Sequence, residues 1–386
     1  MTHRPSVLIT DSNLRTALYT IRSLGRSGYR VIAMSPSSAR EDDLGGCSRY
    51  LAERIVCPSV VTDPEAFTEV LIREARRADV IFPIGMHSIR VVAAHLPEFA
   101  SAKTLLPDLK TIDRADYAQQ LLPFAASIGI PQPLQYNFED LTGARAGAEV
   151  VRYPVIVKAG IEGAIAPSAR YRIVDNMSDF VSAFETIAQI SPRPIVQEIV
   201  SGRVYGYEAL YQGGRMVRQF CHRRLRQYPL KGGPSTYCES VRHPEVIRLG
   251  RTLLDALAWD GLAMVEFMVD ESTGAINLME INPRPWGSMA LPIVAGIDFP
   301  VLWVRAAMGE FLEQVEEFPA GVRMRLLMND LQAVASLVPG ESSWANRFAL
   351  LASVCDPRVH DGILSWSDPV PSWQYVVKAL RRVGRS

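Results

Sequence analysis

Two glutamates in the second half of the chain have the spacing to bind a cation together. The runs on either side of a Ser-Thr-Gly turn at 272–274 are apolar and strand-prone, which predicts a β-hairpin. A three-residue loop with its glycine in the left-handed conformation would close on Glu271 and Ala275. In that register Glu266 lies directly opposite Glu280, with β-carbons roughly 4.5–5.5 Å apart, where like charges destabilise a sheet. We therefore expect a cation over this pair.

Asn282 lies two residues beyond Glu280 on the same strand, so it shares the face of that glutamate. The alternative is a longer loop or a bulge. Either would place Glu266 and Glu280 on opposite faces of the hairpin and leave the sequence EINPR as an ordinary strand end.

The N-terminal part of the chain predicts a parallel sheet covered by helices. Strand patterns at 7–10, 29–35 and 80–85 alternate with helical patterns at 16–28 and 63–79. The first strand-to-helix turn, TDSNLRT, contains no glycine, so it does not fit the glycine-rich turn that binds a dinucleotide. We expect a scaffold domain whose loops help to form a cleft.

From about residue 114 the pattern changes. We expect strands at 153–160 and within 194–211, a basic run at 221–240 that leads into a Gly-Gly loop, and a helix at 243–259 before the hairpin. We find no motif in the last part of the chain. The predicted domains are 1–113, 114–320 with a lid at about 134–205, and a C-terminal extension at 321–386.

Composition gives no reason to expect a nucleic acid or a membrane as partner. The 386 residues include 41 basic and 41 acidic side chains, so the formal net charge is zero. No apolar stretch is long enough to span a bilayer, and the N-terminus runs directly into a strand without the pattern of a signal peptide. The five cysteines have no CxxC spacing. We expect a cytoplasmic protein, with a homodimer left open.

The order of these elements over roughly residues 5 to 310 resembles the ATP-grasp superfamily, which includes biotin carboxylase, carbamoyl-phosphate synthetase and D-alanine ligase. The most specific element is Glu266 followed by the sequence EINPR, which contains Glu280, Asn282 and Arg284. The resemblance implies a two-part ATP-grasp domain with an α+β lid and an antiparallel core. It also implies that both glutamates and the asparagine hold Mg²⁺, with Mn²⁺ as a substitute, against the phosphates of ATP.

The resemblance assigns the nucleotide to the lid and to the strand after it. Lys158 is similar to the lysine that reaches the α- and β-phosphates from the lid. The sequence VQEIV resembles the hinge that holds adenine. The implied contacts are Gln197 or Glu198 to the exocyclic amine, the backbone of Ile199 and Val200 to the ring edge, and Tyr205 or Glu208 to the ribose.

The sequence HRRLR resembles a basic stretch that clamps the phosphates. Arg224 and Arg226 are two residues apart on a predicted strand and would share a face, whereas Arg223 would point away. The alternative is a solvated basic patch. Arg284 is the candidate that orients the substrate carboxylate and stabilises an acyl-phosphate.

The segment after Arg284 is expected to shape the acceptor pocket through Trp286, Gly287 and Ser288, with Gly287 permitting close approach. The loop at 232–235, with Gly233 and Ser235 as candidate contacts, would cover the site and exclude water.

Two departures from the family pattern concern the nucleotide. The expected lid loop at 160–170 has glycines only at 160 and 163, whereas family lid loops are usually glycine-rich. The stretch DRADYAQQ at 113–120 lacks the lysine that many members carry there, and Arg114 is its candidate replacement, although a guanidinium is not equivalent to an ammonium.

The resemblance implies an ATP-dependent, ADP-forming carboxylate–amine ligase acting on an amino acid or a related small metabolite. Two alternatives stay open. The first is a carboxylase-type enzyme that activates bicarbonate as carboxyphosphate. The second is a nucleotide-binding module without catalysis, against which the facing glutamates argue, because a pure scaffold has no reason to keep them.

Overall fold

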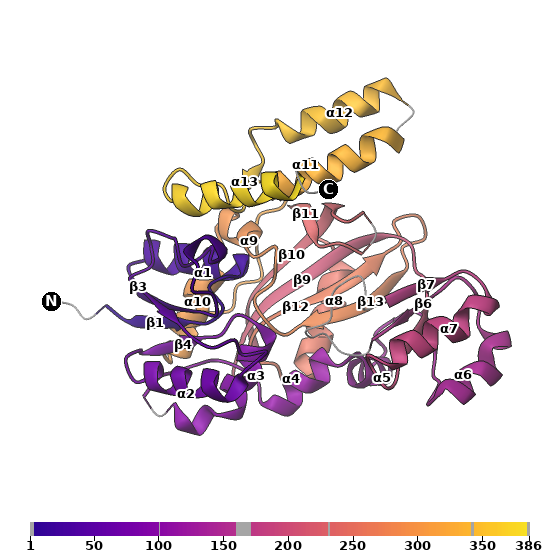
Figure 1. Ribbon diagram of the computed structural model, residues 1–386, viewed down its shortest axis with the longest axis horizontal. Coiled ribbons are helices and arrows are strands. Elements are labelled where there is room, and N and C mark those ends of the chain that lie inside the picture. The colour runs from indigo at the N-terminus through magenta and orange to yellow at the C-terminus, as the bar shows by residue number, and fades with distance from the viewer. Residues whose placement is uncertain (1–3, 100, 160–170, 231, 341–342, 384–386) are drawn as a thin grey trace.

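The computed structural model describes residues 4–99, 101–159, 171–230, 232–340 and 343–383. The expected α/β architecture is confirmed: a parallel sheet, a small antiparallel sheet and a large, mainly antiparallel sheet follow one another along the chain (Figure 1). The parallel sheet and the small sheet lie at opposite ends of the long axis, with the large sheet between them. The predicted lid loop at 160–170 lies outside the described residues.

The N-terminal sheet has the strand order β3-β2-β1-β4 and is parallel throughout. Its strands are β1 (Ser6–Ile9), β2 (Arg30–Ser35), β3 (Glu53–Val56) and β4 (Val80–Phe82). Alternate residues of β1 enter two different cores, with Val7 on one side and Leu8 on the other. Helices α1 (Arg15–Arg26) and α10 (Phe299–Ala307) cover the first side, and α2 (Pro64–Ala75) and α3 (Met86–Ala94) cover the second.

The small sheet, which we call the lid sheet, has the order β5-β8-β6-β7. Its strands are β5 (Gln135–Tyr136), β6 (Val155–Lys158), β7 (Tyr171–Val174) and β8 (Ile195–Glu198). Helices α6 (Leu141–Gly147) and α7 (Met177–Ala188) pack on it. Phe180 and Phe184 of α7 are fully buried in this separate core, so the lid sheet carries its own hydrophobic centre.

The large sheet contains seven strands in the order β13-β12-β9-β10-β11-β14-β15. They are β9 (Arg203–Gln212), β10 (Arg215–Gln227), β11 (Ser235–Ser240), β12 (Gly261–Val269), β13 (Ile276–Asn282), β14 (Arg323–Arg325) and β15 (His360–Asp361). Helix α8 (Pro244–Ala256) packs on β9 and β10. The last two strands come from the C-terminal extension, so this extension completes the sheet.

The hairpin of β12 and β13 pairs Glu266 with Glu280, as expected, but the predicted loop is wrong by one residue. The amide of Asp270 donates to the carbonyl of Ala275 at 2.9 Å, which leaves four residues in the loop. A β-bulge at Met279 adds one residue to β13 and restores the expected pairing at the glutamates. The loop glycine has φ 76°, in the left-handed region as predicted.

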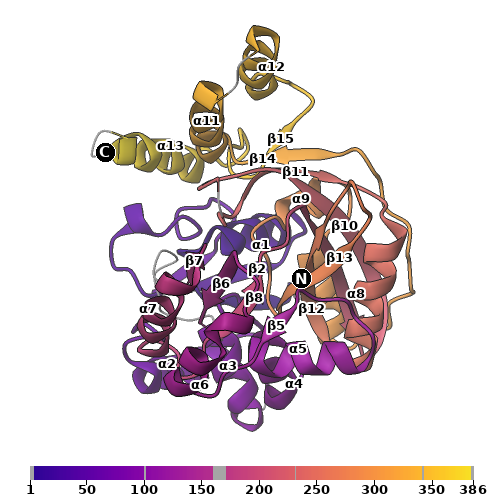
Figure 2. The ribbon, with the colours of Figure 1, turned by 90° about the vertical axis from the view of Figure 1, so that its right-hand side faces the viewer.

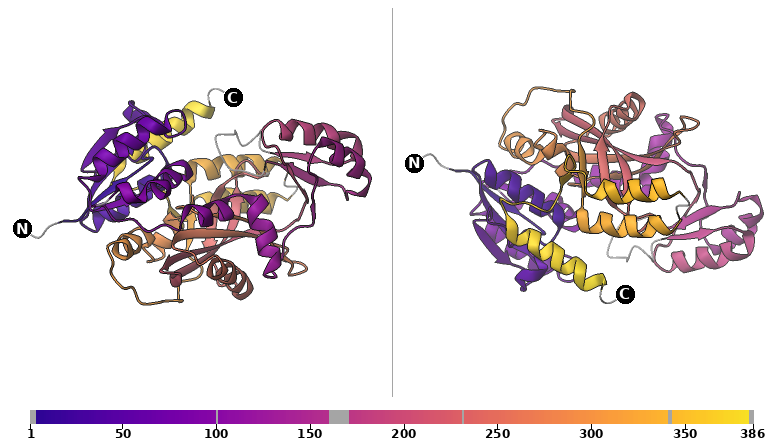
Figure 3. Two further views of the ribbon diagram at one scale, coloured as in Figure 1. Left: turned by 90° about the horizontal axis from the view of Figure 1, so that it is seen from below. Right: turned by 90° about the horizontal axis from the view of Figure 1, so that it is seen from above.

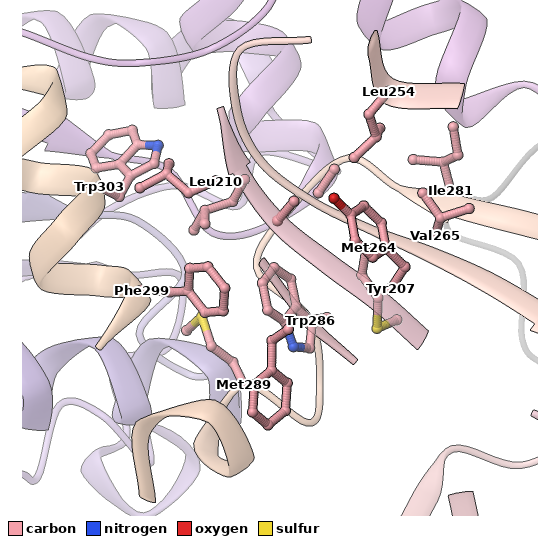
Figure 4. Packing of buried hydrophobic residues seen from close by; sticks show 14 of the residues in the cluster. Tyr207, Leu210, Leu254, Met264, Val265, Ile281, Trp286, Met289, Phe299 and Trp303 are labelled. Atoms are coloured by element: carbon pink, nitrogen blue, oxygen red, sulfur yellow. The ribbon is translucent and has the colours of Figure 1, made fainter. Parts of the chain in front are cut away.

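The main core lies between the large sheet, α8 and α10. Tyr207 and Val265 from the sheet point toward Leu254 of α8, and Trp286 stacks edge to face on Phe299 of α10 at 5.4 Å between ring centroids (Figure 4). Aromatic side chains of this size dominate the energetics of a core, so the segment after β13 is anchored by Trp286.

The remaining helices are short or belong to the C-terminal extension. They are α4 (Leu109–Asp116), α5 (Ala118–Ser127), α9 (Ala290–Val294), α11 (Leu327–Leu337), α12 (Trp344–Val354) and α13 (Pro369–Val383), with 3₁₀ turns at Arg40–Asp42, Leu96–Glu98, Ala148–Val150 and Val338–Gly340. Among the described residues, no helix combines the length and apolar character needed to cross a bilayer.

The C-terminal extension packs over one side of the molecule (Figure 2), with α11 and α12 side by side and α13 next to the N-terminal domain (Figure 3). A buried ion pair fixes this contact, because Arg22 of α1 donates to Asp368 at 2.9 Å. Asp368 also accepts from the Ser48 hydroxyl at 2.7 Å and from the Arg49 amide at 2.9 Å. The extension therefore joins the parallel sheet to the large sheet.

Replacing Asp368 with Asn should lower the free energy of unfolding by about 3–5 kcal/mol, because it leaves Arg22 as an uncompensated buried charge. Urea denaturation followed by circular dichroism measures the loss. The control is Glu245→Gln, whose partner Arg248 lies on an exposed helix surface, and it should leave the midpoint unchanged. Equal midpoints for Asp368→Asn and the wild type would contradict this account of the extension.

Candidate functional site

The facing glutamates form the centre of the candidate site, and an arginine from β10 supplies a cation at one of them. Nη2 of Arg224 lies 2.6 and 2.7 Å from the two carboxylate oxygens of Glu266. The Asn282 amide donates to Oε1 of Glu280 at 3.0 Å. Glu266 and Asn282 are buried, so their oxygens are held in place. The expectation that a positive charge sits over this face is met here by Arg224.

Arg224 and Arg226 do not share a face, so this expectation is wrong. The β10–β11 register shifts between them, and they pair with Cys238 and Tyr237, two neighbouring residues that point to opposite faces. Arg226 instead binds Asp330 of α11 at 2.5 Å and lies over the ring of Tyr237. Because Arg226 is tied to the C-terminal extension, it is not part of a phosphate clamp with Arg224.

The glutamates open into a cleft of about 920 Å³ between the large sheet and the N-terminal domain. One wall is formed by the ends of β12 and β13, the segment after β13 and the loop at 232–235. The opposite wall comes from turns of the N-terminal domain, at 11–16, 57–61 and 84–87. The expected scaffold domain thus contributes its loops to a cleft. The predicted site residues that line it are Arg224, Gly233, Ser235, Glu266, Glu280, Asn282, Arg284, Gly287 and Ser288.

Trp286 does not line the cleft, and its assignment to the acceptor pocket is wrong. Its side chain is fully buried against Phe299, on the core side of the segment. Gly287 does permit a close approach, as expected, but the approaching group is protein: a β-carbon on Gly287 would lie 2.8 Å from Nη2 of Arg15. The segment therefore touches both the core and the N-terminal domain.

The two ribose candidates lie on opposite faces of β9, because side chains alternate along a strand. Val204 lines the cleft, so Tyr205 points away from it; its hydroxyl donates to Glu271 at 2.9 Å. Burial raises the pKa of Tyr205. Tyr205 is therefore not positioned to contact a nucleotide in this cleft. Glu208 faces the cleft side, but its side chain is completely buried.

The lid candidates lie outside the cleft lining. Lys158 ends β6, and Gln197 and Glu198 end β8, the neighbouring strand of the lid sheet. Gln197 is buried between β5 and β6, so β8 is an inner strand of this sheet rather than an edge. Ile199 and Val200 form the connection from the lid sheet to the large sheet, where an adenine hinge is expected.

Arg114, the candidate replacement for the missing lysine, lies on α4 with its guanidinium over the Phe124 ring, at 5.3 Å from the ring centroid. It is absent from the cleft lining described above. This cation–π contact links α4 to α5 and gives Arg114 a structural role.

Sequence reasoning named Glu208 and Ser288 but missed His222, which joins them in a buried polar cluster at the cleft wall, where His222 and Ser288 both line the cleft. Nδ1 of His222 lies 3.0 Å from Oε1 of Glu208, and the hydroxyl of Ser288 donates to the same oxygen at 3.3 Å. Burial raises the pKa of Glu208, an effect that nearby His222 opposes. The three residues come from β10, β9 and the segment after β13. No local signal in the sequence connects them, because only sheet packing brings them together.

The donor set suits a hard divalent cation. Two opposed carboxylates and a side-chain amide oxygen are ligands that Mg²⁺ accepts, and Mg²⁺ commonly completes its shell with phosphate oxygens and water. No group of three or more His, Cys, Asp and Glu side chains with metal-binding geometry occurs among the described residues. The guanidinium of Arg224 shows that Glu266 is accessible to a cation from the cleft side.

Comparison with known proteins gives three consistent findings. Residues 192–329 match a family model described as ATP-grasp in the biosynthetic pathway with Ter operon. The chain is 25% identical, over 248 residues, to the carbamoyl phosphate synthase large chain of Thermomicrobium roseum. That match covers 61% of this chain and 22% of the length of the synthase, so the chain spans only about a fifth of this relative.

Solved structures share the fold at lower identity. Biotin carboxylase from Campylobacter jejuni superposes with a TM-score of 0.68 at 19% identity, covering 83% of this chain and 74% of that one. An L-amino acid ligase from Bacillus licheniformis superposes with a TM-score of 0.62 at 16% identity, covering 81% and 77%.

Replacing Arg224 with Gln should leave the buried carboxylate of Glu266 without its ion-pair partner and cost up to about 3–5 kcal/mol, the scale for breaking a buried pair. Adding Mg²⁺ without nucleotide should then raise the melting temperature of the variant more than that of the wild type. Differential scanning fluorimetry with and without Mg²⁺ measures this. Arg223→Gln, on the same strand but paired with Glu239, is the matched control and should show no added response. An equal Mg²⁺ response in all three proteins would contradict the arrangement.

Replacing Glu208 with Gln should stabilise the protein at pH 8 but not near pH 4. The folded-state pKa of Glu208 is raised by burial, so the folded protein loses stability as the pH rises through that pKa and the carboxyl must ionise in a buried site. Gln cannot ionise and is spared this loss. Melting curves of both proteins across this pH range give the difference; a gap that does not change with pH would refute the assignment.

Proposed function

The chain belongs to the ATP-grasp superfamily, and from that premise we propose that it is an ATP-dependent ligase. It would activate a small carboxylate as an acyl-phosphate for attack by an amine, with release of ADP and phosphate. The single observation that carries the proposal is the opposed pair of Glu266 and Glu280 in the lining of a cleft that also contains Arg284.

The side chains of the cleft have the charges that phosphoryl transfer requires. This reaction needs little covalent chemistry from the protein, and depends on positioning and on neutralising the phosphate charge. Glu266, Glu280 and Asn282 would hold Mg²⁺, which supplies charge neutralisation at the phosphates. Arg284 would orient the acid through a planar pair of donors. Lys158 would reach the nucleotide from the lid sheet.

Arg224 would change its partner when nucleotide binds. A metal ion at Glu266 would neutralise the carboxylate that Arg224 now pairs with. The guanidinium would then be available to the neighbouring phosphates. The loop at 232–235 is coupled to this change, since Nη1 of Arg224 lies 3.4 Å from the carbonyl oxygen of Gly233. The same loop lines the cleft and would keep water from a hydrolysable acyl-phosphate.

The carboxylase alternative has one observation in its favour, the fold likeness to biotin carboxylase. The N-terminal wall argues for an organic acid instead. Leu14, Val60 and Met86 line it, and a bicarbonate ion has no apolar surface to bury against such side chains.

The decisive experiment is an acid-dependent ADP-release assay with hydroxylamine as the trapping nucleophile. We expect ADP formation to require an organic acid and the trap to yield a hydroxamate. Glu280→Gln should lower both rates by at least about 10²-fold, the scale for removing one electrostatic stabiliser of a transition state. Glu245→Gln changes an exposed side chain of α8 that is not part of the cleft lining; it is the control and should retain wild-type rates.

The outcomes separate the candidate functions. ADP release that bicarbonate stimulates, without any hydroxamate, would identify the carboxylase alternative. ATP binding without ADP release under either condition would identify a nucleotide-binding module. Wild-type turnover by Glu280→Gln would show that the metal assignment is wrong.

A further inference from the structure

The N-terminal domain contributes one guanidinium to the cleft, and it lies across from the metal-site segment. Arg15 is the first residue of α1 and lines the cleft together with Arg284. Its Nη2 occupies the space beside Gly287, 2.8 Å from the position of a β-carbon there. Arg15 thus contacts the backbone three residues after Arg284, although the two arginines come from different domains.

Arg15 has no ion pair or hydrogen bond with any residue that the structure describes. It is half-buried, and a partly desolvated charge without a partner is unfavourable. Among the described residues of the N-terminal domain that line the cleft, the acid is Asp11, whose carboxylate already accepts from the Gly85 amide at 2.9 Å and the Ser88 hydroxyl at 3.0 Å. We therefore expect the guanidinium of Arg15 to bind an anionic group of a ligand in the cleft.

The topology places Arg15 where ligands bind in open parallel sheets. The chain passes from β1 outward to β2 and β3 and then returns to the other side of β1 as β4, so the strand order reverses between β1 and β4. Ligands bind outside the carboxyl ends of the strands at such a point. Helices α1 and α3 begin there, neither has a side-chain cap or an acidic residue in its first turn, and their positive ends add to the charge of Arg15.

We propose that Arg15 binds a second anionic group, a carboxylate or a phosphate, on the acid that the enzyme activates. The inference rests on the proposed ligase function and narrows its substrate to small acids with two anionic groups. Arg284 would take the reacting carboxylate and Arg15 the distal one. Both arginines line the same cleft, and Arg15 lies beside Gly287, whose α-carbon is at most about 11 Å along the backbone from that of Arg284. A small diacid is therefore the size of ligand that we expect to contact both.

The test uses hydroxylamine as nucleophile, so that only the acid site is probed. Succinate, glutarate, adipate and the ω-phosphono acids of the same lengths are each compared with the matching monocarboxylate. The wild type should prefer the dianionic acids. Arg15→Gln should raise their KM by about 10- to 100-fold, the equivalent of one charge-assisted hydrogen-bonded contact, with kcat changed little and the monocarboxylates unaffected.

Two further variants and a control make the result specific. Gly287→Ala should reproduce the selective loss in weaker form, because the new β-carbon displaces the flexible end of Arg15 while the backbone of Gly287 accepts alanine. Arg15→Lys should restore part of the affinity, since it returns the charge without the planar donor pair. Arg76→Gln removes an exposed arginine of the same domain, outside the cleft, and should change nothing.

A binding measurement separates this inference from the proposed function. If no acid supports ADP release, the ligase function fails, but calorimetric titration of the same diacids into wild type and Arg15→Gln still tests the anion site. Binding by the wild type that is lost in the Arg15 variant supports the site. No preference for diacids in the wild type, or equal losses for diacids and monoacids in Arg15→Gln, overturns it.

Discussion

The repulsion between Glu266 and Glu280 is the constraint on which the rest of the site depends. Two carboxylates directly opposed on neighbouring strands need a cation, and the structure places Arg224 at one of them. The bulge at Met279 keeps the pair in register, and buried Trp286 fixes the segment that follows. The large sheet therefore contains an unfavourable pair of like charges at the point where it lines the cleft.

The cleft is built from two walls that the C-terminal extension holds together. The extension adds β14 and β15 to the large sheet and binds the N-terminal domain through the buried pair of Arg22 and Asp368. Its second buried pair, Arg226 with Asp330, draws one arginine of the basic run away from the site and leaves Arg224 on the cleft side. A segment without a recognisable motif thus sets both the position of the N-terminal wall and the charge of the cleft.

Much of the hairpin that contains the candidate metal ligands could be predicted, because local rules govern it. Alternation along a strand and the turn residues at 272–274 predicted the pairing of Glu266 with Glu280, but the structure reaches it through two compensating differences: the loop is one residue longer than expected, and the bulge at Met279 corrects the register. We predicted that Arg224 and Arg226 share a face, and they do not. The register shift between them in β10 depends on the partners that β11 and α11 provide, which the local sequence does not show. Trp286 was misplaced for a similar reason: only the position of α10 makes its side of the segment the core side.

The sequence by itself determined the α/β class, the hairpin, its opposed glutamates and the position of Asn282 and Arg284 after them, because each follows from contacts between residues close in the chain. Only the tertiary structure decided which distant residues join them. Glu208, His222 and Ser288 meet at the cleft wall, and Arg15 reaches Gly287 across a domain boundary. These encounters depend on how sheets and helices pack in three dimensions, and no spacing along the chain encodes that packing.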